Sequence, residues 1–156
     1  MSRDVRRAQD LQENQGVVSY VGQGVEPRSV SVARPPEHVD TYRLGAHPDV
    51  VERLWTQLNG ELPDDARYLV ADTAALVHSR TGLVLAVALG TAYAIRLEGA
   101  ALQEALSDGF GTVHEFTTVG RTLDLAATFG AGWVFGRFDE REGSWLRASL
   151  EARSNL

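Results

Sequence analysis

The 156-residue chain contains no cysteine and no lysine. Without cysteine it has no disulfide framework, no thiol nucleophile and no thiolate metal site. Without lysine it has no Walker-type phosphate loop, because that motif requires Gly-Lys-Ser/Thr. All fifteen basic residues are arginine. The arginine fork suits anion recognition, although the codon usage of a GC-rich genome is the simpler explanation.

Targeting and membrane signals are also missing. Residues 1–15 lack the apolar stretch of a signal peptide. The best candidate for a membrane span, residues 83–95, is shorter than the ~20 residues that a spanning helix needs, and Gly90-Thr91 interrupts it. We therefore expect a soluble, cytoplasmic protein with no membrane partner.

The net charge of −6 is unevenly distributed. Residues 1–47 carry six arginines and six acids, whereas residues 48–156 carry nine arginines and fifteen acids. A nucleic-acid-binding protein normally has a basic face, and the only cluster of basic residues is Arg3, Arg6 and Arg7. We therefore expect no nucleic-acid partner, and the acidic main domain favours a basic protein partner.

The most apolar part of the chain, residues 67–97, organises the predicted fold. Turn-forming residues divide it into four short segments, which predicts a β-meander. The predicted strands are 67–71, 74–78, 83–89 and 92–97. Because residues 83–89 are continuously apolar, this strand is expected at the centre of the sheet, covered on both faces.

Helical periodicity predicts helices at residues 48–59, 99–107 and 140–153, the last with Ser144 as an alternative start. Residues 112–117 and 133–138 are predicted as further strands, and residues 122–126 are ambiguous. Since the strands follow one another without helical crossovers, the expected fold is α+β: a largely antiparallel β-meander sheet with two or three helices packed on one face.

Residues 1–47 are predicted to form an N-terminal arm, a short hairpin and a proline-rich connector, before a main α+β domain at residues 48–156. The hairpin strands are 17–21 and 29–33, and Pro35-Pro36 ends regular structure. The polar arm, residues 2–14, is either frayed, docked or a partner-binding helix. The arm and the sheet edges leave a homodimer open.

Sequence motifs of catalysis or cofactor binding are absent. The two Gly-x-Gly stretches, at residues 22–24 and 130–132, do not complete the dinucleotide fingerprint. The chain also has no GxSxG and no HExxH motif. We therefore expect no cofactor and no metal.

Histidine is the remaining residue type suited to acid–base chemistry. His78 and His114 lie on predicted strands, and if those strands pair, their imidazoles converge with Glu115, Asp72 or Asp124. The candidate catalytic residues are therefore His78, His114, Glu115 and Asp124. The alternative is that both histidines are ordinary strand residues.

Four arginines are candidates for an anionic ligand: Arg80, Arg96, Arg121 and Arg137. Of these, Arg80, Arg96 and Arg137 are the predicted ligand-binding residues. Arg137 interrupts an apolar strand, so it requires a buried acid or a solvated face.

The order of helix, Leu62-Pro63-Asp64-Asp65 and meander resembles the opening of SUKH-type bacterial immunity domains. The similarity does not include that family's Asn-Gly-Gly turn, so no residue roles are transferred.

Together these features favour a non-catalytic interaction protein of the immunity, inhibitor or adaptor type, which binds a protein partner. The alternative is a small enzyme or small-molecule binder with a pocket near His78, His114 and the central arginines.

Overall fold

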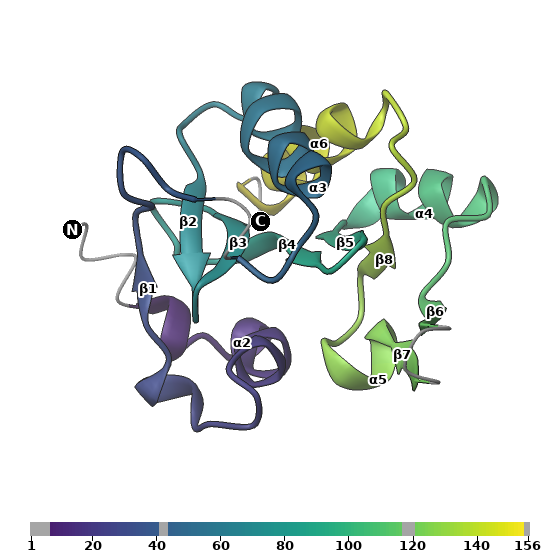
Figure 1. The fold of residues 1–156 in the computed structure, drawn as a ribbon. Coiled ribbons are helices and arrows are strands. Elements are labelled where there is room, and N and C mark those ends of the chain that lie inside the picture. The colour runs from purple at the N-terminus through teal and green to yellow at the C-terminus, as the bar shows by residue number, and fades with distance from the viewer. Residues whose placement is uncertain (1–6, 41–43, 117–120, 155–156) are drawn as a thin grey trace.

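The computed structural model describes residues 7–40, 44–116 and 121–154. The fold is α+β, as predicted, and is built on a six-stranded antiparallel sheet in the order β1-β2-β3-β4-β5-β8 (Figure 1). The strands are β1 (Val32–Ala33), β2 (Arg67–Val70), β3 (Thr73–Val77), β4 (Val84–Leu89), β5 (Ala92–Arg96) and β8 (Trp133–Phe135). A separate two-stranded sheet pairs β6 (Val113–Phe116) with β7 (Arg121–Asp124).

Helices cover both faces of the main sheet (Figure 1). They are α2 (Gln15–Val21), α3 (Pro48–Glu52), α4 (Gly99–Ser107), α5 (Leu125–Thr128) and α6 (Glu142–Ser154), and the π-helical segment η5 (Arg53–Leu58) continues α3. The three predicted helices are α3 with η5, α4 and α6, and together they form one layer. The second layer, α2 and α5, was not predicted. No helix in the described ranges is long and apolar enough to cross a membrane.

The predicted meander is confirmed as β2 to β5. Pairing between β3 and β4 contains a bulge, because Leu76 faces Ala86 whereas Val77 faces Val84. Leu85 is the extra residue, and it therefore packs in the same cluster as Ala86. The regular alternation of side chains between the two faces of the sheet is broken there.

The N-terminal hairpin prediction was wrong. Residues 17–21 belong to helix α2, and of the second predicted strand only Val32–Ala33 forms a strand, which pairs with β2. A short apolar run does not distinguish a strand from a buried helix. Here the helix buries Val17 and Val18 completely in the core between the second layer and the sheet.

The described part of the arm is docked, through the 3₁₀ turns η1 (Arg7–Gln9) and η2 (Gln12–Asn14). Asn14 is fully buried, and its side-chain amide donates to the carbonyls of Ala8 and Gly82 at 2.9 and 2.8 Å. Its Oδ1 accepts from the backbone N–H of Val84 at 3.0 Å. These bonds join the N-terminal segment to the central strand.

The C-terminal helix begins at Glu142, between the predicted start at residue 140 and the alternative start at Ser144. Ser144 lies in the first turn instead, where its hydroxyl donates to the carbonyl of Arg141 at 2.8 Å. The ambiguous residues 122–126 divide between β7 and α5. Asp124 marks the change, since its side chain caps the helix by accepting from the N–H of Ala127 at 3.3 Å.

Candidate functional site

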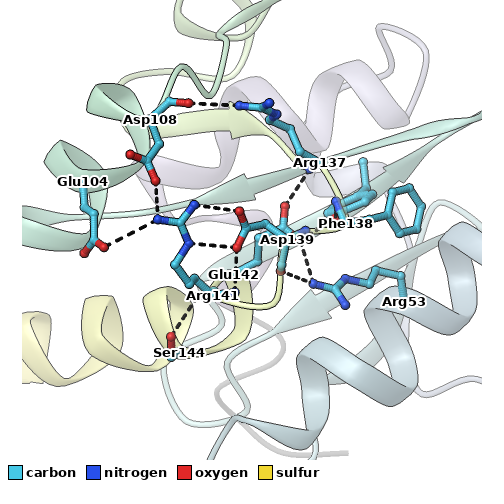
Figure 2. A network of polar contacts seen from close by, with 10 residues as sticks. Arg53, Glu104, Asp108, Arg137, Phe138, Asp139, Arg141, Glu142 and Ser144 are labelled. Carbon is cyan, nitrogen blue, oxygen red and sulfur yellow. Dashed lines mark hydrogen bonds and ion pairs between the residues drawn. The ribbon is translucent and has the colours of Figure 1, made fainter.

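A buried carboxylate lies at the junction of four segments (Figure 2). Glu142, at the start of α6, is completely buried. Its Oε1 accepts from Tyr93 Oη at 2.5 Å, Arg53 Nη2 at 2.8 Å and the N–H of Asp139 at 3.2 Å, and its Oε2 accepts from the N–H of Arg137 at 2.7 Å. The four donors come from η5, β5 and the turn between β8 and α6.

Local backbone geometry brings these groups together. Arg53 begins the π-helical segment η5, in which it is buried along with its neighbours Leu54 and Trp55. A π-helical segment is wider than an α-helix, and the 3.6-residue period did not predict a buried arginine. Gly136 gives Tyr93 its space, because a Cβ at that position would lie 1.8 Å from the tyrosine ring.

The electrostatics of this network are those of a structural anchor. Four donors contact the carboxylate of Glu142, three at Oε1 and one at Oε2. Burial and the hydrogen bond to Glu142 raise the pKa of Tyr93 far above its usual value. Tyr93 therefore stays protonated near neutral pH and donates to Glu142.

The turn between β8 and α6 contains a residue with an unusual backbone conformation. Phe138 has a φ of 55°, which is rare for a bulky residue, and its N–H donates to Tyr93 Oη at 2.7 Å. Its ring packs edge-on against Tyr93 and stays 53% exposed. On the adjacent surface Arg141 lies between Asp139 and Asp108 (Figure 2), and the Arg141 guanidinium holds the pKa of Asp139 well below its usual range.

The predicted catalytic residues divide between two sheets: His114, Glu115 and Asp124 lie on the paired strands β6 and β7, whereas His78 adjoins the main sheet. His78 follows β3, which pairs with β2 and β4, whereas His114 and Glu115 lie on β6, which pairs with β7. The strand pairing that the shared site required is therefore not formed. His78 Nδ1 lies 2.7 Å from Thr81 Oγ1, and the ring of His114 packs 5.3 Å from that of Phe135.

The predicted ligand-binding arginines are held separately, each by a neighbour in its own part of the fold. Arg80 pairs with Asp64 at 3.8 Å, and Arg96 pairs with Glu98 at 3.0 Å. The guanidinium of Arg137 donates to the carbonyl of Asp108 at 3.0 Å. The solvated face expected for Arg137 is confirmed, and its backbone N–H also reaches the buried acid.

A hollow lies elsewhere, on the α2 side of the molecule. It is an open groove of about 1140 Å3, lined by the C-terminal half of α2 and the turn after it, the β4–β5 turn, β7 and the end of α5. The predicted catalytic residues and Arg80, Arg96 and Arg137 are not among the described residues that line it. Of the arginines considered in the sequence, only Arg121 lines this groove.

Strand β7 presents an edge to the groove. Its consecutive residues Arg121, Thr122 and Leu123 all line the wall, and no described strand other than β6 pairs with it. The N–H of Leu125 donates to the carbonyl of Thr112 at 2.8 Å. Because hydrogen-bonded and non-hydrogen-bonded pairs alternate along an antiparallel ladder, this bond makes Glu115 and Thr122 a non-hydrogen-bonded pair. The N–H and C=O of Thr122 therefore point away from β6, toward the outer edge.

The sequence predicted neither the buried Glu142 network nor the groove. Glu142 is one of four consecutive charged residues, 139–142, and nothing in the sequence distinguishes the buried one. The groove joins segments that are far apart in the chain, so no local pattern reports it.

Comparison of the chain with protein-family models, with curated proteins and with solved structures gives no match. Within the described residues, no group of three or more metal-ligating side chains is placed to hold a metal ion.

Replacing Glu142 with glutamine is predicted to lower the free energy of unfolding by about 3–5 kcal/mol, because it leaves the buried Arg53 cation without its counter-charge. Chemical denaturation at neutral pH measures this loss. The matched control is Glu151→Gln, which breaks the exposed pair with Arg147 and is expected to change the stability by less than about 1 kcal/mol. Equal effects of the two variants would contradict a structural role for the buried carboxylate.

The raised pKa of Tyr93 predicts a loss of stability in alkali. Above about pH 10 the unfolded chain releases this phenolic proton while the folded chain keeps it, so stability falls as pH rises. The stability advantage over Tyr93→Phe should therefore shrink by about 1.4 kcal/mol for each pH unit above pH 10. Denaturation of both proteins between pH 8 and pH 11 measures this, and a constant difference would show that Tyr93 titrates normally.

Proposed function

We propose that the chain is a non-catalytic, cytoplasmic interaction protein of the immunity, inhibitor or adaptor type. Its protein partner places an extended segment in the groove, as an additional strand along the outer edge of β7. The observation that carries the proposal is an open groove whose wall is an unpaired strand edge. Strand addition to such an edge is a common mode of peptide recognition.

The chemistry of the groove supports binding over catalysis. The described lining residues include no histidine, aspartate or glutamate, and their ionisable side chains are Arg121 and Tyr20. A reaction that needs a general base has none among them. Outside the groove, the buried carboxylate of Glu142 accepts hydrogen bonds from four donors of the fold itself.

The size of the groove supports a macromolecular partner. Small-molecule sites usually enclose about 300–1,000 Å3, whereas this groove is open and has a volume of about 1140 Å3. At longer range, the net charge of −6 favours encounter with a partner that is basic overall.

The second candidate function is small-molecule binding. Hydroxyl groups of Ser19, Thr73, Thr122 and Thr128 belong to residues that line the groove. A few polar groups in a largely apolar pocket are typical of small-ligand sites.

Replacing Thr122 with proline is predicted to weaken partner binding by about tenfold, because proline removes the outward N–H that a docked strand would use. The N–H of Thr122 does not serve the β6–β7 ladder, so the hairpin keeps its pairing. Thr122→Val is the matched control, since it keeps the N–H and should bind like the native chain. The partner is first recovered from the source cells with the tagged chain, and calorimetry then measures its affinity for each variant.

Equal binding of the proline and valine variants would contradict strand addition at β7. Native mass spectrometry of the protein isolated from its source separates the two candidates. A bound small molecule, with no stoichiometric protein partner, would overturn the proposal in favour of small-molecule binding.

A further inference from the structure

Among the side chains that the structure describes, those of residues 8–40, 44–115 and 121–153, Arg121 has the one arginine side chain without a partner. The other arginines of these ranges are held by an acid or by a backbone carbonyl: Arg28, Arg34, Arg53, Arg67, Arg80, Arg96, Arg137, Arg141, Arg147 and Arg153. Arg121 is exposed and lines the groove. The other guanidinium groups of these ranges bind acids or carbonyls of the protein itself, whereas Arg121 lines the groove without such a partner.

The surroundings of Arg121 give its charge a local effect. The described lining residues contain no carboxylate, so no neighbouring acid in the groove wall neutralises the guanidinium. Arg121 has five N–H donors in a fixed fork, which matches a carboxylate in two-point contact. Because Arg121 is on β7 next to the outward N–H of Thr122, a strand docked on this edge passes within reach of it.

We propose that the segment bound in the groove carries an acidic residue, Asp or Glu, whose carboxylate pairs with Arg121 and fixes the position of the segment along β7. This inference rests on the proposed function, and it names the chemistry of the partner segment. It is compatible with a basic partner, because the −6 net charge acts on the whole partner at long range whereas Arg121 selects one side chain at contact distance.

The test uses the full chain and a phage-displayed library of random linear peptides. Peptides selected by the native chain are expected to share an acidic residue at one position. With a synthesised selected peptide, Arg121→Gln should weaken binding by about tenfold and remove most of its dependence on salt. The charge reversal Arg121→Glu should select peptides with Lys or Arg at that position. Arg28→Gln, at an exposed arginine outside the groove, is the control and should bind like the native chain.

The outcomes separate this inference from the proposed function. If selected peptides bind and Thr122→Pro weakens them, but no acidic position emerges or Arg121→Gln binds equally well, the role of Arg121 is wrong while strand addition stands. If no peptide is selected and the natural partner binds Thr122→Pro and Thr122→Val alike, both are wrong. Thermal unfolding of each variant measures whether the fold is retained. We expect it to be retained in the Arg121 variants, because Arg121 is exposed on an edge strand.

Discussion

The fold depends on one buried ion pair with its hydrogen bonds. The carboxylate of Glu142 joins η5 through Arg53, β5 through Tyr93, and the β8–α6 turn through backbone N–H groups. A buried pair of this kind adds little net stability compared with apolar residues of the same shape. Its consequence is geometric, because only one arrangement of these segments supplies all the donors, and that arrangement sets where α6 begins.

The constraint also accounts for the backbone at Phe138. A bulky residue with positive φ costs of order 1–3 kcal/mol and persists where its surroundings fix it. The N–H of Phe138 donates to the same tyrosine hydroxyl that binds Glu142. The strained turn and the buried carboxylate therefore form one rigid unit, which packs on the α3, α4 and α6 face of the sheet.

The opposite face has a different character. There the helices are short, the two-stranded sheet leaves an edge of β7 unpaired, and the groove lies between them. The molecule thus combines a tightly bonded layer with a layer that offers backbone groups and the guanidinium of Arg121, which has no partner among the described side chains. Binding sites in proteins are often built this way, on loops and edges that a rigid scaffold positions.

The sequence predicted what depends on local patterns. The meander follows from turn residues between apolar segments, and α4 has the bounds expected from its periodicity, Gly99–Ser107. Residues 17–21 were mistaken for a strand because five apolar-rich residues fit either structure, and burial decided the outcome. Neither Glu142 nor the groove was predictable, because each depends on how distant segments meet. Arg121 was named among four arginines, but nothing in the sequence indicated that the other three would find internal partners.

Amide hydrogen exchange of the chain with and without its purified partner tests the central claim most directly. Strand addition predicts that the outward amide of Thr122 gains strong protection on binding, while amides of the Glu142 network, which are already bonded in the free chain, change little. Unchanged exchange along β7 in a saturated complex would contradict the assignment of this edge as the binding site.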